Sequence, residues 1–316
     1  MPLPSSNYPG GFGAGGATIR NLPVLNTYSG DVYWVDSNGG GGSRGTFGRP
    51  CLTINEAIAL CTANKGDIIM VKAGHVEAIA NATALVCNKA GVAIIGMGRG
   101  AMRPTLTFGT AATANIPVSA ANVTFDNILF VANFADIASV FTLTTGPEFA
   151  VNNCEFRDTS SILNFLTIVT TTVAVVADGL VFTNNRVSSL GTTAATTMVK
   201  IVGTHDRVAI NDNLYVGAVL NNTAALLAHA ALVVTNLEMA RNKVFRLNTD
   251  TATGGILITT TSTTNTGMVY ENYIKCADAA GIILVTAGCK YGMFQNLVSG
   301  EADTSGFVLP ALDTNA

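Results

Sequence analysis

Charged residues are scarce in this chain of 316 residues. Asp, Glu, Lys and Arg make up 12% of it, about half the ~25% of an average globular protein, and the formal net charge is −3. A surface that binds nucleic acid or acidic lipid needs a basic stripe. The sequence therefore predicts neither a nucleic-acid partner nor a membrane partner, and so much uncharged surface is more typical of an assembly subunit than of a free monomer.

Signals for membrane insertion, secretion and metal binding are missing as well. The longest nearly uncharged apolar run, residues 224–234, is too short to span a bilayer. Residues 1–6 have neither the basic start nor the apolar run of a secretion signal. The six cysteines form no CxxC pair and no cluster with metal-ligand spacing. We expect a soluble chain made in the cytoplasm, with reduced, buried cysteines and with no metal ion or cofactor.

The chain does contain a repeat of asparagines. Seven of them recur at intervals of 24 to 32 residues, each in a stretch where apolar residues alternate with others. Such a period indicates a repeat architecture, and alternation of period two indicates strands. We predict that each asparagine takes the left-handed backbone conformation at the same corner of successive turns. This predicted ladder consists of Asn127, Asn153, Asn185, Asn213, Asn242, Asn272 and Asn296.

Four segments are expected along the chain. Residues 1–30 are rich in glycine and proline and cannot build a core, so we predict an extended arm. Ordering such an arm costs on the order of 1–2 kcal/mol per residue, which a partner surface would offset. Residues 31–84 are predicted to form an N-terminal cap and first coil, residues 85–300 a solenoid of strands, and residues 301–316 a closing tail.

A helix is predicted within the cap. Thr53 and Glu56 have the spacing of a capping box. Ile54 and Ile58 start an apolar face, and Gly66 is predicted to end the helix. A covering helix suits the open end of a solenoid, where apolar interior and unpaired backbone would otherwise be exposed.

The residues around this helix resemble the opening of the pectate-lyase-like right-handed parallel β-helix superfamily. Residues 33–36 resemble its first strand, residues 50–54 its turn before the helix, and residues 66–77 its first full coil. With the asparagine corners, the resemblance spans roughly residues 32–300. It implies an all-β fold, a single-stranded right-handed parallel β-helix with an N-terminal capping helix and an extended N-terminal arm. The superfamily includes polysaccharide lyases and hydrolases, phage tailspikes and non-enzymatic virion proteins.

Two local acidic pairs are candidates for catalytic groups, because sugar-cleaving hydrolases need two carboxylates ~5–9.5 Å apart. We expect Glu155 and Asp158 to be solvated surface charges, and Asp206 to form a local ion pair with Arg207 rather than to act with Asp212. The paired-aspartate and Gly-His-Gly motifs of the polygalacturonase-like members are absent. So are the clustered aspartates of the calcium-dependent lyases. The sequence therefore predicts no catalytic residues and no enzyme.

The resemblance, the arm and the uncharged body favour a bacteriophage virion protein that decorates or cements the capsid. The resemblance also implies a homotrimer. We expect it on the capsid surface, bound to the major capsid protein and stabilising the head. The predicted contacts lie in the arm, at Tyr8, Pro9, Phe12, Ile19, Arg20 and Leu22.

Two other interpretations stay open. The main alternative is a tailspike or receptor-binding protein that binds or cleaves host polysaccharide, for which an acidic, aromatic-lined groove is expected. The other is a bacterial polysaccharide lyase.

Overall fold

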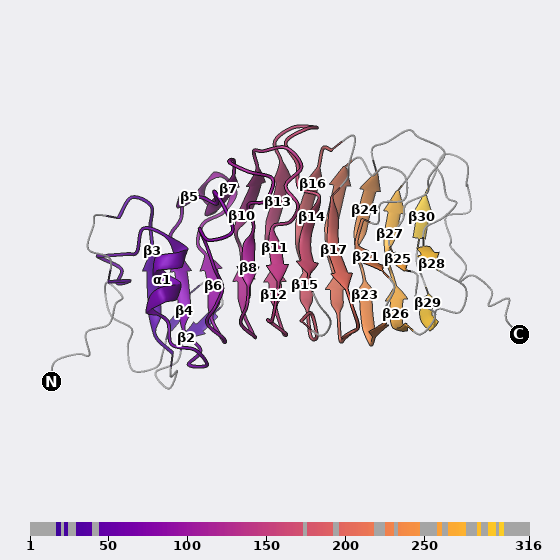
Figure 1. The fold of residues 1–316 in the computed structure, drawn as a ribbon, viewed down its shortest axis with the longest axis horizontal. Coiled ribbons are helices and arrows are strands. Elements are labelled where there is room, and N and C mark those ends of the chain that lie inside the picture. Colours follow the sequence, from indigo (N-terminus) through magenta and orange to yellow (C-terminus); the bar gives the residue numbers. More distant parts are fainter. Residues whose placement is uncertain are drawn as a thin grey trace, which may run out of the picture.

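The structure is a computed structural model. It describes residues 30–39, 44–172, 176–191, 196–217, 225–230, 233–246 and 265–275, and the strands at 17–19, 22–24, 258–260, 283–285, 290–294 and 297–299. Three parallel sheets run along a rod, and their strands follow one another in chain order from end to end (Figure 1). The predicted all-β parallel β-helix is therefore confirmed.

The three sheets differ in length. The first sheet has ten strands: β3 (Val32–Val35), β4 (Ile68–Val71), β6 (Ala93–Gly96), β9 (Thr124–Asp126), β12 (Ala150–Asn152), β15 (Val181–Thr183), β19 (Ala209–Asn211), β23 (Leu237–Ala240), β26 (Thr266–Tyr270) and β29 (Lys290–Phe294). The second sheet has nine: β5 (Val76–Ala78), β7 (Thr105–Phe108), β10 (Leu129–Ala132), β13 (Glu155–Asp158), β16 (Arg186–Ser189), β20 (Leu214–Gly217), β24 (Lys243–Arg246), β27 (Tyr273–Lys275) and β30 (Leu297–Ser299). The third sheet has seven: β8 (Ile116–Val118), β11 (Phe141–Leu143), β14 (Thr167–Thr171), β17 (Thr197–Val202), β21 (Leu227–Ala230), β25 (Ile258–Thr260) and β28 (Ile283–Val285). A short parallel pair, β18 (His205–Asp206) and β22 (Val234–Thr235), lies between the third and first sheets along the chain.

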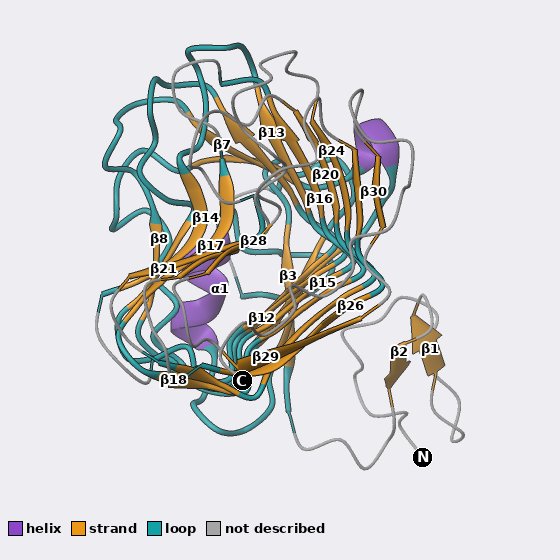
Figure 2. Ribbon diagram, turned by 90° about the vertical axis from the view of Figure 1, so that its right-hand side faces the viewer, coloured by secondary structure: helices purple, strands orange, loops and turns teal. Residues whose placement is uncertain are grey.

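The core follows from the alternation seen in the sequence. In β9 the middle residue Phe125 is fully buried and its neighbours are only partly buried. Because stacked turns keep the same register, phenylalanines from successive strands contact one another. Phe130 and Phe156, which are paired in register, are stacked with ring centroids 4.9 Å apart. Phe125 and Phe141, from the first and third sheets, lie 4.9 Å apart across the interior. The interior is thus a continuous apolar column enclosed by the three sheets (Figure 2).

Helix α1 (Ile54–Leu60) lies at the N-terminal end of the rod, where it packs on β3 and β4 (Figure 1). The predicted cap at Thr53 is confirmed, since its side chain accepts a hydrogen bond from the Glu56 backbone N–H at 3.2 Å. The predicted end at Gly66 is wrong. The helix ends at Leu60 because the next residue, Cys61, has extended backbone angles, and Gly66 instead occupies a turn at φ 79°.

The terminal segments lie largely outside the described residues. Within the predicted arm, β1 (Ala17–Ile19) and β2 (Leu22–Val24) form an antiparallel pair. The side chains of the six predicted partner-contact residues are not among those described, nor are Asn296 and the predicted tail at 301–316.

A short 3₁₀ helix, η1 (Gly100–Met102), follows a glycine-rich turn. No helix in the described part of the chain combines the length and apolar character needed to cross a membrane.

Candidate functional site

The corner between the first and second sheets carries a column of residues in the left-handed conformation. Their φ angles lie between 51° and 59°. The column consists of Asn127, Asn153, Asn184, Asp212, Arg241 and Glu271. The prediction of a left-handed corner is therefore right for Asn127 and Asn153. It is wrong for Asn185, Asn213, Asn242 and Asn272, which each follow a left-handed residue by one position.

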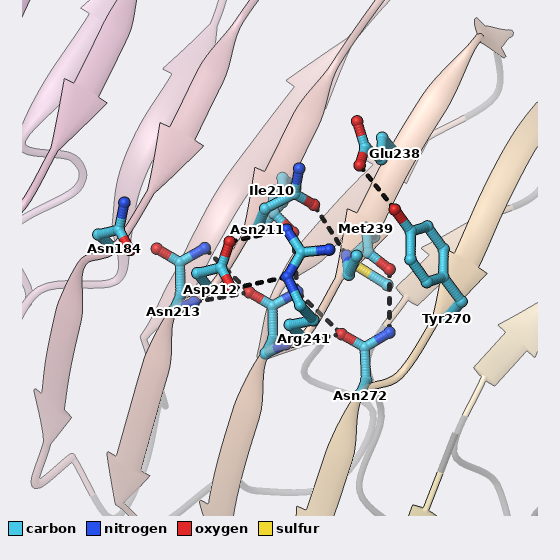
Figure 3. A network of polar contacts seen from close by, with 12 residues as sticks. Asn184, Ile210, Asn211, Asp212, Asn213, Glu238, Met239, Arg241, Tyr270 and Asn272 are labelled. Carbon is cyan, nitrogen blue, oxygen red and sulfur yellow. Dashed lines mark hydrogen bonds and ion pairs between the residues drawn. The ribbon is translucent and has the colours of Figure 1, made fainter. Parts of the chain in front are cut away.

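These four later asparagines form a buried ladder of side-chain hydrogen bonds. Figure 3 shows Asn213 and Asn272, two of its members. The backbone N–H of Asn185 donates to Asn213 Oδ1 at 2.9 Å, and that of Asn213 donates to Asn242 Oδ1 at 3.0 Å. Each side-chain amide also donates to a carbonyl of the preceding turn, as Asn213 does to Phe182 O at 2.9 Å. Since a buried polar group must be paired, asparagine is selected here for its amide rather than for its backbone preference.

The polar group best suited to acid–base chemistry lies on the outside of this corner, on the fourth of the ten strands of the first sheet. Asp126 ends β9 and is half-buried. Its Oδ1 is buried without a hydrogen-bond partner, and so is Nε of Arg103. The Asn153 side chain hydrogen-bonds to the Asp126 carboxyl. Burial raises the pKa of Asp126, and Asn153 and the Arg103 charge reduce that rise.

A second carboxylate completes the cluster. Glu155, the first residue of β13, accepts from Arg103 at 3.2 Å and from Arg157 at 2.7 Å. Arg103 interacts with both carboxyls, because it forms an ion pair with Glu155 and its charge lowers the pKa of Asp126. We name Arg103, Asp126, Asn153, Glu155 and Arg157 the acidic corner. A half-buried carboxyl whose pKa is raised, beside a second carboxylate that is bound by two arginines, is an arrangement suited to acid–base chemistry.

The outer face of the second sheet continues from the acidic corner with cations and aromatic rings. Strand register places Arg186 next to Glu155 and Lys243 next to Leu214. Arg186, Lys243 and Lys275 are exposed, and none forms an ion pair with another described residue. The rings of Phe245 and Tyr273 lie 5.7 Å apart on the same face. We name this surface the cationic face.

The acidic pairs considered in the sequence do not form. Glu155 and Asp158 lie three residues apart in one strand and so face opposite sides of the sheet. Asp158 is 3% exposed, which contradicts its expected place on the solvated surface. Asp206 lies beside β22 and Asp212 at the left-handed corner, and each binds its own arginine, Arg207 at 3.3 Å and Arg241 at 2.8 Å. The predicted local ion pair of Asp206 is confirmed.

Other titratable groups are buried within the described part of the chain. His75 is fully buried, and its Nε2 lies 3.1 Å from Glu77. Cys51, Cys61, Cys87 and Cys154 are buried and free, as predicted, and burial raises the pKa of the Cys51 thiol to about 11. Across the described ranges, no three His, Cys, Asp or Glu side chains gather in a way that could hold a metal ion.

The sequence analysis missed Asp126, which precedes a corner asparagine. Its position in the strand is occupied by Asn152 in the next turn and by Thr183 in the turn after that. The side chain at this position is polar and faces outward in both of those turns. An acidic residue at the same position of β9 could therefore have been recognised from the sequence as a candidate. Its neighbours Arg103 and Glu155 are distant in sequence, and no local pattern joins them.

Comparison with known proteins supports the fold. No protein-family model and no curated protein matches the sequence. The pectin methylesterase from Aspergillus niger aligns at 14% identity over 88% of this chain and 88% of its own, with a TM-score of 0.50. A rhamnogalacturonan lyase aligns at 12% identity over 85% and 87%, with a TM-score of 0.36. The pectate lyase Pel9A aligns at 14% over 86% and 78%, with a TM-score of 0.34.

The likeness to the pectin methylesterase shows the fold and no more.

Proposed function

We propose that this chain acts on a polysaccharide, which binds along the cationic face and is cleaved at the acidic corner. The observation that carries the proposal is Asp126, a half-buried carboxyl whose pKa is raised by burial and whose Oδ1 has no partner. An unpaired buried oxygen costs about 1–3 kcal/mol, and a ligand hydroxyl that donates to it would remove that cost. Perturbed carboxyls of this kind concentrate at functional sites.

The roles of the two carboxyls follow from their surroundings. Asp126 is desolvated, so it holds a proton to higher pH than a free aspartate and can donate it to a leaving oxygen. Glu155 is paired with Arg103 and Arg157. Its carboxylate can stabilise positive charge that develops on the sugar ring, and a water molecule adds to the ring carbon as the glycosidic bond breaks, which completes the hydrolysis.

The ligand class follows from the cationic face. Arg186, Lys243 and Lys275 have no carboxylate partner among the described residues, and so can pair with acidic groups of a polymer. The rings of Phe245 and Tyr273 offer flat apolar surface to sugar rings. An acidic polysaccharide fits both features. The pectin methylesterase of the same fold is itself named for a polysaccharide substrate.

Activity assays on a panel of acidic and neutral polysaccharides test this proposal. We expect wild-type protein to bind an acidic polysaccharide in affinity electrophoresis and to release new chain ends. Asp126→Asn removes the proton donor, and we expect it to lower kcat by about 10²-fold or more while binding is retained. The matched control is Asp212→Asn, at an exposed acid whose carboxylate is bound by Arg241, and we expect it to leave kcat unchanged.

Loss of function in both variants, or none in Asp126→Asn, would contradict the role of the acidic corner. Absence of binding to every polysaccharide would contradict the whole proposal and favour the capsid-decoration hypothesis. That hypothesis, with its homotrimer and its place on the virion, stays a prediction. Electron microscopy of phage particles labelled for this protein checks it.

A further inference from the structure

The two carboxyls of the acidic corner share one arginine, which comes from a different turn of the chain. Arg103 Nη1 lies 3.2 Å from Glu155 Oε2, and the Arg103 charge also acts on Asp126. The Arg103 side chain is 18% exposed. A long, flexible side chain keeps one half-buried position only when the backbone beneath it is held in place.

The backbone that carries Arg103 follows a tight turn, residues 96–102. At Gly98, φ is 101°, and a Cβ there would clash with the Met102 carbonyl oxygen, so the turn requires glycine at this position. Pro104 restricts the residue before it to extended backbone, and Arg103 has φ −65° and ψ 132°. The place from which the Arg103 side chain starts is therefore set by where the turn lies.

Asn127 holds this turn against the corner between the first and second sheets. Its side-chain Nδ2 donates to Gly96 O at 2.7 Å and to Gly98 O at 3.1 Å. Asn127 is 8% exposed, so these hydrogen bonds are shielded from water. Because Asn127 directly follows Asp126 in the chain, its amide joins the turn that precedes the arginine to the backbone that carries the aspartate.

We propose that Asn127 is a positioning residue of the acidic corner, which acts by holding the turn that carries Arg103. Its amide keeps the guanidinium between the two carboxyls and has no contact of its own with either of them. The proposal rests on the proposed function, because it takes the acidic corner as the reacting site. Asn127 also has the left-handed backbone that the sequence predicted, with φ 57°, so one residue forms the corner and orders the site beside it.

The protonation of Asp126 reports where Arg103 lies. The Arg103 charge and the Asn153 hydrogen bond both favour the ionised carboxyl, and both act against burial. The Cys154 thiol is also close, but it stays neutral because burial raises its pKa to about 12. Glu155 is the other carboxylate at the corner, and it binds Arg103 directly. When Arg103 moves away, the effect of burial is offset less, and the pKa of Asp126 rises.

Asn127→Gly tests the proposal, because glycine keeps the left-handed backbone and removes the amide. The pKa of Asp126 is measured by NMR titration of its carboxyl carbon, assigned with Asp126→Asn. We expect a rise in Asn127→Gly equal to that in Arg103→Gln, and no further rise in the double variant, because Asn127 acts through Arg103. Asn127→Ser, which keeps one donor, should give a smaller rise in the same direction.

The matched control is Asn122→Gly. Asn122 is an exposed asparagine at another corner, also with φ 57°, and we expect its substitution to leave the Asp126 titration unchanged. An unchanged pKa in Asn127→Gly would overturn the proposal. So would a rise in the double variant beyond that of Arg103→Gln, because it would mean that Asn127 acts on Asp126 without Arg103.

Activity separates this proposal from the proposed function. Where the protein cleaves a polysaccharide, the basic limb of its kcat profile should move to higher pH together with the Asp126 pKa, because the proton donor must be protonated. A shifted pKa in a protein that cleaves no polysaccharide would support the positioning of Arg103 and contradict the proposed function. Cleavage with an unshifted pKa in Asn127→Gly would contradict the positioning role alone.

Discussion

The buried carboxylate of Asp158 shows how one residue can connect loops from two turns. It ends β13, and its two oxygens accept from the backbone N–H groups of Phe165 at 3.0 Å and Leu190 at 2.9 Å. Burial nevertheless raises the pKa of Asp158 to about 6, and these hydrogen bonds offset only part of the rise. The protein therefore binds a proton at this residue more tightly when folded than when unfolded.

This difference predicts a pH dependence of stability. The contribution of the raised pKa is fully present below about pH 4, the unfolded value, and is lost as pH rises through about 6. We expect wild-type stability, measured relative to Asp158→Asn by urea unfolding, to fall by about 2 kcal/mol between pH 4 and pH 7. A difference that stays constant over this range would show that Asp158 has an ordinary pKa.

At the scale of elements, the corner between the first and second sheets contains two neighbouring columns of residues, which differ in what determines the residue type. The left-handed column tolerates varied side chains, including Asp212, Arg241 and Glu271, because their side chains are exposed. The buried ladder uses asparagine in four consecutive turns, because each amide must both donate and accept. In the preceding turn, the backbone N–H of Cys154 still donates to Asn185 Oδ1 at 2.9 Å, which ends the ladder.

Substitutions in the buried ladder should therefore lower the free energy of unfolding, whereas substitutions at exposed residues of the left-handed column should not. Asn213→Ala leaves the buried Asn185 N–H and Phe182 carbonyl without their partners, and we expect it to lower the free energy of unfolding by about 3 kcal/mol. Asn184→Gly is the control at an exposed left-handed residue, φ 56°. We expect a change within about 0.5 kcal/mol there. Equal losses in denaturant titrations would contradict the distinction between the columns.

The whole molecule is a stack in which each turn contacts only its neighbours, so its length should be adjustable in units of one turn. Deleting residues 213–241 joins Asp212 to Asn242 and keeps a left-handed residue followed by a ladder asparagine. We expect this variant to fold, with a Tm within about 10 °C of wild type. Deleting residues 213–226 instead removes about half a turn, brings strands of different sheets into register and should abolish folding by circular dichroism. Equal behaviour of the two variants would contradict a one-turn unit.

Much of the architecture could be predicted because its signals are local. Alternation within each strand decides which residues are buried, as at Phe125, and the recurrence of asparagines marks one corner per turn. The helix start was also predictable, since Thr53 and Glu56 make a contact within one helical turn. Each of these features depends on residues a few positions apart, where the sequence directly controls geometry.

The acidic corner could not be predicted in the same way, because its residues come together only when the turns stack. Arg103 and Glu155 are 52 residues apart, and turns of 24 to 32 residues leave the register between strands undetermined until loops are placed. The one-residue offset of Asn185 from the left-handed position and the inward direction of Asp158 have the same origin. Sequence patterns predict which face of its own strand a residue occupies. Packing and hydrogen bonding across the assembled β-helix decide which residues of other turns it contacts.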